Sequence, residues 1–178
     1  MADLDIRVFT FTEDDAEAFQ CLRLRALKEH PGAFGSSYEA ESGLSLETVA
    51  ARMRRTAESP NAFTLGAYRD GELIGMVGFY RDTLSAKVRH KGHVWGTYVA
   101  SERQGEGVGR RLMQELLARA ARIDGLEQVH LDVVTGNEAA RGLYASLGFE
   151  TYGVEPNALI VDGERLDEAH MVFFIADR

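Results

Sequence analysis

Hydrophobic and polar positions follow two different periods along the chain. Apolar residues three or four positions apart mark one face of an α-helix, and they predict four helices, at about residues 13–29, 45–57, 107–123 and 137–147. Alternating or mostly apolar runs predict strands, at about residues 6–10, 62–68, 73–81, 93–99, 129–134, 150–154 and 168–175. Pro31-Gly32 and Gly35-Ser36-Ser37 indicate that residues 30–44 form a loop.

The order of these elements predicts a mixed sheet. The first strands follow one another as hairpins, and Asp70-Gly71 is typical of such a turn. The later strands alternate with helices. We therefore expect an α/β fold built on a sheet with both strand directions. The 178 residues fit a single domain, 1–178, and no repeat or linker-like tract divides them.

Composition narrows the class of protein. With 45% apolar and 27% charged residues the chain can bury one core, and no window approaches the roughly 18 apolar residues of a membrane span. The start, from Met1 to Asp5, lacks the pattern of a secretory signal. The one cysteine, Cys21, lies in a helical apolar pattern that predicts core packing, and no Cys/His group has zinc spacing. We expect a cytoplasmic protein without a metal.

The net charge of −8 argues against a nucleic-acid partner, because phosphates would be repelled. An anionic ligand would need local positive potential, which backbone amides at the start of a helix can supply. The acidic surface would suit a cationic substrate.

Three alternating glycines stand between a predicted strand and an amphipathic helix. The strand ends near Val99, a short polar loop follows, and Gly105, Gly107 and Gly109 lead into the helix. Glycine permits positive φ and a close approach of the backbone to a ligand. The amides of this turn, including those of Val108 and Arg110, can therefore converge on a phosphate.

Two commoner phosphate motifs do not match this turn. A Walker loop ends in Gly-Lys-Ser/Thr, whereas Gly109 is followed by two arginines. A dinucleotide fingerprint is spaced G-x-G-x-x-G, whereas the spacing here is G-x-G-x-G. The pattern from Gln104 through Gly107 to Gly109 instead resembles the pyrophosphate loop of the GNAT superfamily of N-acetyltransferases, which starts with Arg or Gln.

A second motif strengthens the resemblance. Asn137 is followed seven residues later by Tyr144, and then by Gly148-Phe149, as in the second motif of that superfamily. Seven residues return to the same helix face and span about 10 Å, which suits a pantetheine arm lying along the helix. The resemblance is good over about residues 60–155 and weak over the first 58.

The resemblance implies a central, mostly antiparallel sheet of about seven strands flanked by about four helices. It implies acetyl-CoA as co-substrate, with direct acetyl transfer to a primary amine in a ternary complex. Tyr144 would lie beside the sulfur and protonate the leaving thiolate as general acid, since its phenol keeps its proton at neutral pH. The implied cofactor-binding residues are Tyr98, Val99, Gln104, Gly105, Gly107, Val108, Gly109, Arg110, Asn137 and Tyr144.

The chain departs from the superfamily pattern at two positions. Many relatives carry Lys or Arg near position 146, where this chain has Ser146. We expect Arg110, Arg111 or Arg141 to supply the missing charge. Glu106 lies inside the loop and would repel a pyrophosphate, so we expect its side chain to point to solvent.

The acceptor side is less defined by the sequence. Glu39 and Glu41 lie in the loop between the first two predicted helices, a region that borders the acceptor pocket in related enzymes; the alternative is a solvated acidic loop. His93 has an accessible pKa, with a surface or packing role as its alternative. The acceptor is expected to be a small-molecule or peptide amine, with a cationic one favoured by the acidic surface. Homodimers are common among relatives.

Two other functions stay open. One is a non-catalytic acyl-CoA-binding or sensing domain of the same fold, against which the presence of Tyr144 and a full glycine loop argues. The other is a nucleotide-binding module, which would bind ATP and not coenzyme A.

Overall fold

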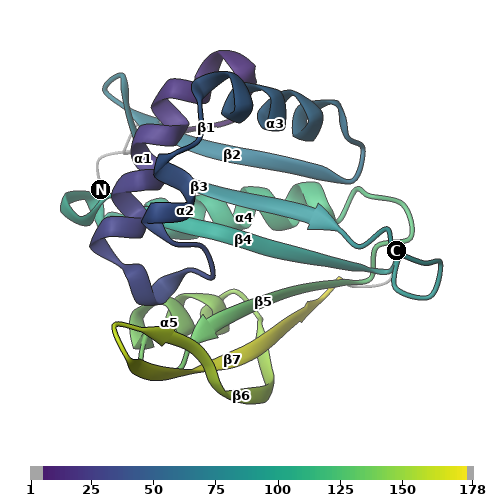
Figure 1. Ribbon diagram of the computed structural model, residues 1–178. Coiled ribbons are helices and arrows are strands. Elements are labelled where there is room, and N and C mark those ends of the chain that lie inside the picture. The colour runs from purple at the N-terminus through teal and green to yellow at the C-terminus, as the bar shows by residue number, and fades with distance from the viewer. Residues whose placement is uncertain (1–5, 176–178) are drawn as a thin grey trace.

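The computed structural model describes residues 6–175, so the start of the chain, where no secretory signal is expected, lies outside this range. Seven strands form one sheet in the order β1-β2-β3-β4-β5-β7-β6 (Figure 1). Neighbours are antiparallel except β4 and β5, which are parallel. The strands are β1 (Arg7–Thr10), β2 (Ala62–Arg69), β3 (Glu72–Arg81), β4 (Lys91–Val99), β5 (Gln128–Val134), β6 (Glu150–Val161) and β7 (Glu164–Phe174). The expected mostly antiparallel sheet is confirmed.

Helices cover both faces of this sheet. One core cluster joins α1 and α3 to one face of the sheet, and a larger cluster joins α4 and α5 to the opposite face (Figure 1). The α-helices are α1 (Ala16–Glu29), α2 (Tyr38–Ser42), α3 (Leu46–Glu58), α4 (Val108–Ala120) and α5 (Glu138–Ser146). Short 3₁₀ turns are η1 (Glu13–Asp15), η2 (Pro31–Ala33) and η3 (Ser101–Arg103). Among the described residues, no helix has both the length and the apolar character for a membrane span.

The helix starts have clear local causes. Thr12 and Asp15 form a capping box ahead of α1, with the Thr12 amide donating to the Asp15 carboxylate over 2.8 Å. Ser45 caps α3 by accepting from the Thr48 amide over 3.2 Å. Both helices therefore begin close to the positions that their polar capping residues predicted.

Three details differ from the sequence-based expectation. Cys21 is exposed and not in the core, because the inward face of α1 is formed by Phe19, Leu22 and Ala26. The expected loop after α1 contains the short helix α2, capped by the Ser37 side chain. The last two strands are longer than predicted, because β6 and β7 pair as a long hairpin although the register shifts between Glu155 and Leu159.

The parallel pair β4–β5 separates toward the end of β4. The two strands pair from Lys91 to His93 with Gln128 to His130, and not beyond. In β4, Gly96 has φ of 64° and the register with β3 shifts opposite this point, as in a β-bulge, which bends a strand. The result is a wedge between β4 and β5 that opens toward the start of α4.

Candidate active site

A cavity of about 780 Å³ occupies this wedge. Its walls come from the end of β4, the glycine turn before α4, the start of α5 and the η2 segment after α1. Every cofactor-binding residue expected from the sequence lines it: Tyr98, Val99, Gln104, Gly105, Gly107, Val108, Gly109, Arg110, Asn137 and Tyr144. Segments that lie far apart in the sequence therefore meet around one space large enough for a small-molecule ligand.

The glycine turn has the geometry of an anion cradle. Gly105 and Gly107 have φ of 79° and 81°, and Gly107 is the N-cap of α4. A Cβ atom at either position would meet no atom within 4 Å, so both face open space. The free amides of the first helical turn and the positive end of the helix dipole point into this space. The turn therefore fits a pyrophosphate without needing a net positive charge.

Two side chains support the turn. The Gln104 amide donates to the Val99 carbonyl over 3.2 Å and joins the end of β4 to the glycine turn. Arg110 lines the cavity, and its guanidinium donates to the Ser146 hydroxyl over 2.7 Å. Of the arginines expected to replace a cation at position 146, Arg110 is thus placed to do so, whereas Arg141 donates to the Thr135 carbonyl.

Glu106 does not point freely to solvent as expected. Its carboxylate pairs with Arg69 on β2 at 2.5 Å, and about 31% of its side chain is exposed. The ion pair neutralises the carboxylate that the sequence placed inside the phosphate turn. The negative charge of Glu106 is therefore offset by Arg69, a residue far away in the sequence that the spacing of the motif could not identify.

Asn137 and Tyr144 lie at the two ends of α5. The Asn137 side-chain oxygen caps the helix by accepting from the Ala140 amide over 3.1 Å, so its amide nitrogen is the group that can donate to a ligand. Tyr144 is 7% exposed and lies on the cavity wall. Burial raises its pKa, and a hydrogen bond with Thr97 opposes that change. Its phenol is therefore protonated at neutral pH.

Comparisons with known proteins agree with this geometry. The profile of the acetyltransferase (GNAT) family matches residues 16–149, which is most of the chain. The chain belongs to the acetyltransferase (GNAT) family. By class it is an N-acetyltransferase, as the sequence predicted, and enzymes of this family use acetyl-CoA.

Two curated relatives are acetyltransferases with different names. N-alpha-acetyltransferase RimI of Mycobacterium tuberculosis is 36% identical over 113 residues, which cover 64% of this chain and 68% of RimI. Mycothiol acetyltransferase of Thermobispora bispora is 34% identical over 155 residues, which cover 84% of this chain and 48% of that protein. The chain thus spans about half the length of that second relative.

Solved structures share the fold at low sequence identity. A GNAT acetyltransferase of Streptococcus pneumoniae has a TM-score of 0.88 at 23% identity, covering 97% of this chain and 100% of that one. The yncA protein of Salmonella typhimurium, solved with its cofactor acetyl-CoA, has a TM-score of 0.84 at 20% identity, covering 98% and 96%. At these identities the likeness establishes the GNAT fold.

A second, smaller cavity of this GNAT chain meets the first one at Tyr144. Thr97, Asn137 and Tyr144 line both cavities, and Asp132 on β5 lines the smaller one. Sequence reasoning did not single out Asp132. The alternation of side chains along β5 could have identified it. Leu131 and Val133 face the core, so Asp132 between them must point to the opposite face of the sheet.

Asp132 has an ordered partner on that face. His170 on β7 contacts the Asp132 carboxylate through Nδ1 at 2.5 Å and faces Glu155 through Nε2 at 3.5 Å. The hydrogen bond to Asp132 is the main cause that raises the pKa of His170. Burial, followed by the nearby charges of Asp132 and Glu155, raises the pKa of Glu168 on the same strand. The smaller cavity therefore opens beside a group of acidic side chains.

The residues expected to border the acceptor pocket make other contacts, and their role toward the acceptor stays a prediction. Glu41 pairs with the buried Arg23 at 2.8 Å, and this ion pair fastens α2 to α1. Glu39 is exposed on α2. His93 stacks on Tyr80 with ring centroids 5.0 Å apart. None of the three expected residues lines either cavity.

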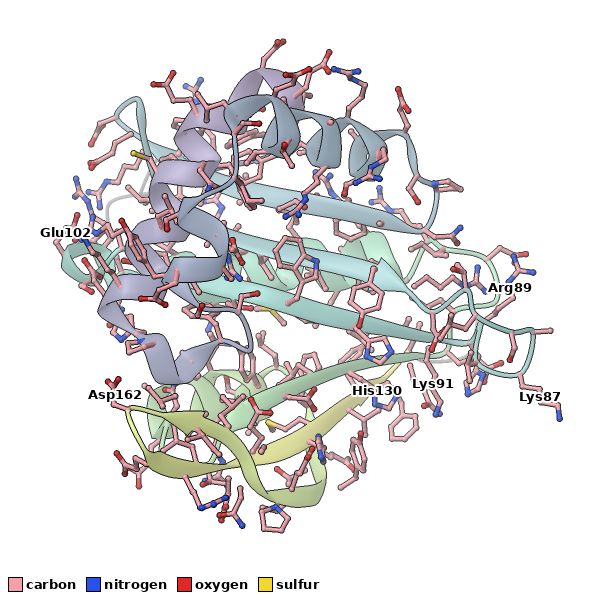
Figure 2. All side chains as sticks on the ribbon, in the orientation of Figure 1. Lys87, Arg89, Lys91, Glu102, His130 and Asp162 are labelled. Atoms are coloured by element: carbon pink, nitrogen blue, oxygen red, sulfur yellow. The ribbon has the colours of Figure 1, made fainter. Side chains whose placement is uncertain are left out.

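His93 belongs instead to a line of aromatic and imidazole rings, which we call the ring row. Its members, in the order in which successive rings contact one another, are Tyr80, His93, His130, Tyr152 and His170. Successive ring centroids are 5.0 to 5.8 Å apart. Figure 2 shows His130 on the part of the sheet that no helix covers, near Lys91. The ring row ends at His170, beside Asp132 and the mouth of the smaller cavity.

Among residues 6–175, no three His, Cys, Asp or Glu side chains lie together as the ligands of a metal ion would.

Proposed function

We propose that this chain transfers the acetyl group of acetyl-CoA to a primary amine by direct transfer in a ternary complex. The observation that carries the proposal is that two cavities meet at Tyr144. The larger one is lined by the glycine turn and the smaller one by Asp132, while Asn137 and Tyr144 line both. One cavity would thus hold the cofactor while the other admits the acceptor.

Each end of the larger cavity fits one part of acetyl-CoA. The amides around Gly107 would bind the pyrophosphate, with Arg110 as the nearby cation. Asn137 would bond the amides of the pantetheine arm, and the backbone of Tyr98 and Val99 would form the facing wall. A backbone amide of this strand would stabilise the charge that develops on the acetyl oxygen.

Tyr144 is proposed as the general acid. When bound, acetyl-CoA supplies an activated thioester, and transfer makes a carbon–nitrogen bond while the carbon–sulfur bond breaks. The phenol of Tyr144 would give its proton to the departing sulfur. Burial raises the pKa of Tyr144, so the proton is present at neutral pH.

Asp132 is proposed as the acceptor of the proton that the substrate ammonium must lose. Its carboxylate lines the same small cavity as Tyr144, so acid and base would act on opposite sides of the reacting carbon. Either direct contact or a bridging water would carry the proton. His170 holds one oxygen of this carboxylate, and the other oxygen would face the amine.

The acceptor side favours a cationic amine with an apolar or aromatic portion. The carboxylates of Asp132, Glu155 and Glu168 would attract the ammonium group, and the ring row would contact the rest of the molecule through its ring faces. The names of the relatives include both a protein N-terminal acetyltransferase and small-molecule acetyltransferases. A small-molecule or peptide amine is therefore proposed as the class.

Calorimetry with acetyl-CoA and with ATP, followed by thiol release against a panel of amines, tests the proposal. We expect micromolar binding of acetyl-CoA, no binding of ATP, and thiol release with at least one amine from a panel of amino acids, polyamines, aminoglycosides and peptides. Absence of acetyl-CoA binding would sink the proposal. Binding without thiol release on any amine would favour a non-catalytic acyl-CoA-binding domain. The single domain, the homodimer and the cytoplasmic location stay predictions.

A further inference from the structure

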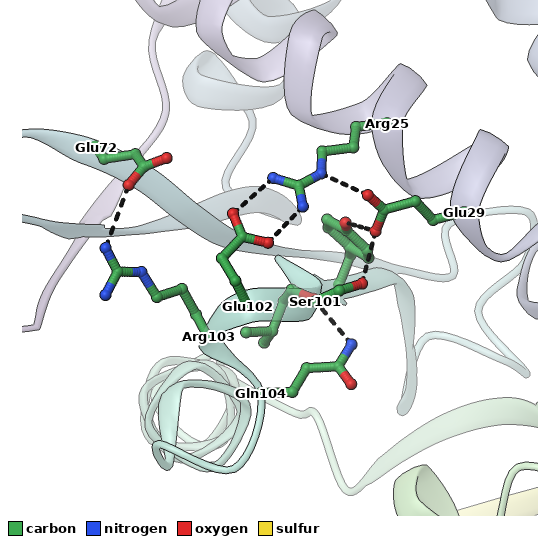
Figure 3. A network of polar contacts seen from close by, with 9 residues as sticks. Arg25, Glu29, Glu72, Ser101, Glu102, Arg103 and Gln104 are labelled. Carbon is green, nitrogen blue, oxygen red and sulfur yellow. Dashed lines mark hydrogen bonds and ion pairs between the residues drawn. The ribbon is translucent and has the colours of Figure 1, made fainter.

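A network of polar side chains joins the end of α1 to Tyr98 on β4 and to the η3 segment (Figure 3). Glu29, the last residue of α1, accepts hydrogen bonds from the Tyr98 hydroxyl over 2.6 Å and from the Ser101 hydroxyl over 2.7 Å. Arg25, one turn earlier, donates to Glu29 over 2.7 Å and bonds both oxygens of Glu102 over 2.5 and 2.9 Å. We call these five residues the α1 bracket.

The α1 bracket lies between two walls of the larger cavity. Residues 30–34 continue directly from Glu29, and His30, Gly32, Ala33 and Phe34 line the cavity on one side. On the other side Tyr98 and Val99 line it, followed by the η3 segment that leads to the glycine turn. The His30 and Tyr98 rings also approach each other, with centroids 6.1 Å apart. A single carboxylate thus joins the end of α1, which leads into one lining segment, to Tyr98 in another, and so fixes the spacing between these two segments.

We propose that Glu29 is a positioning residue that sets the width of the cofactor cavity and thereby the affinity for acetyl-CoA. The inference rests on the proposed function, because it takes the cavity as the acetyl-CoA site. Glu29 has no place in the proposed chemistry and does not line the cavity itself. It would act through the Tyr98–Val99 backbone and through the start of the loop that carries the glycine turn.

The charges of the α1 bracket keep it formed across the working pH range. Hydrogen bonds from Tyr98 and Arg25 lower the pKa of Glu29 to about 2. Burial, followed by the bond to Glu29, raises the pKa of Tyr98 to about 12. Glu29 is therefore an anion and Tyr98 a neutral donor at any pH at which the enzyme is assayed. Charge-assisted bonds of this kind are the stronger and geometrically more defined ones.

A positional role can be separated from a general stabilising role. About a third of the Glu29 side chain is exposed, at 32%, and exposed ion pairs contribute little to stability. A small displacement of a wall that binds a ligand has a large effect on ligand binding, because the binding groups must be held in place. Loss of Glu29 should therefore change cofactor affinity much more than the unfolding midpoint.

The test compares Glu29→Ala with Glu115→Ala in calorimetry with acetyl-CoA. Glu115 pairs with Arg119 on α4 at 2.7 Å in the same i,i+4 arrangement, so it is a matched control outside the α1 bracket. We expect a rise of about tenfold in the Kd for acetyl-CoA in Glu29→Ala, a loss equal to one strong contact. The control should bind as the wild type does, and both variants should unfold at nearly the same denaturant concentration.

Steady-state kinetics and a second variant make the outcome decisive. The KM for acetyl-CoA should rise in Glu29→Ala while kcat at saturation stays within about twofold, because binding is weakened equally in the ground state and the transition state. Tyr98→Phe removes one donor to Glu29 and keeps the ring, so it should weaken acetyl-CoA binding, and the double variant should lose less than the two single losses combined.

Wild-type affinity in both Glu29→Ala and Tyr98→Phe would overturn the positioning role and leave the proposed function intact. A wild-type protein that does not bind acetyl-CoA would overturn both. Glu29→Gln can still accept from Tyr98 and Ser101, so an affinity between those of Glu29→Ala and the wild type would support the role.

Discussion

At the scale of single residues, the proposed reaction depends on two proton-transfer groups, Tyr144 as the acid and Asp132 as the base. Tyr144 is buried between α5 and the sheet, where desolvation keeps the phenol neutral. Asp132 lies on the open side of the same small cavity, with about half of its side chain exposed, at 55%. Burial thus keeps the proposed acid protonated, while the proposed base is open to the acceptor and to water.

Replacing Tyr144 by Phe removes the hydroxyl and keeps the packing of the ring against Phe149. We expect kcat to fall by roughly 10² to 10⁴, the usual contribution of a general acid, while the Kd for acetyl-CoA changes little. Stopped assays of thiol release and calorimetry on the same preparation measure both quantities. Unchanged turnover would remove the acid role from Tyr144 and leave the fold assignment untouched.

Asp132→Asn should lower the pKa of His170 toward its ordinary value, because the bond from His170 to Asp132 is the main cause of the raised pKa. A raised histidine pKa stabilises the folded state below the ordinary value of about 6.5 and loses this effect as pH rises through the folded pKa. NMR titration of the His170 ring protons measures the change. His93, on which Asp132 has a minor influence, serves as the internal control and should shift less.

At the scale of elements, the glycine turn and α4 together form the proposed pyrophosphate site. The turn gives the chain positive φ at the position where the helix begins, and the helix presents its unpaired amides at that point. Neither feature alone makes a phosphate site. Both are encoded within a few residues of sequence, which is why the turn could be identified without the fold.

Gly107→Ala should reduce acetyl-CoA affinity by about tenfold or more, because a methyl group would enter the space that the backbone leaves for the ligand. Gly71→Ala is a matched control, since Gly71 has the same φ of 81° and the same open surroundings but lies in the β2–β3 turn. Both substitutions carry a left-handed backbone cost of about 1–2 kcal/mol. Equal acetyl-CoA affinity in the two variants would contradict the placement of the pyrophosphate.

At the scale of the whole molecule, two cores hold the sheet while the wedge stays open. The larger core packs α4 and α5 on one face, and the smaller core packs α1 and α3 on the other. Because these cores fix β3 and β4 from both sides, β4 can leave β5 without the sheet coming apart. The cavity is thus a consequence of how the layers are packed.

Leu112→Ala tests the larger core. Leu112 on α4 is fully buried and lies against Gly75 of β3, so its truncation should lower the free energy of unfolding by about 2–5 kcal/mol. Leu84→Ala makes the same chemical change at a side chain that is 93% exposed and should stay within about 0.5 kcal/mol of the wild type. Urea denaturation followed by circular dichroism compares them. A small loss at Leu112 would show that α4 contributes less to stability than its burial indicates.

The sequence alone determined the parts of this protein whose signals are local. Helical and strand periods located most elements. The spacing of Gln104, Gly107, Asn137 and Tyr144 singled out residues of two short segments, and these residues line the larger cavity. The tertiary structure decided the contacts between residues that lie far apart in the sequence. It paired Glu106 with Arg69 and Glu41 with Arg23.

Strand neighbours also bring together the residues of the proposed acceptor side. Asp132 and His170 are 38 residues apart in the chain, and they meet because β5 and β7 are adjacent in the sheet. The wedge itself appears where β4 and β5 stop pairing, and no pattern within either strand specifies that point. Periodicity reports which face a residue occupies, whereas only the packed sheet determines what lies opposite it.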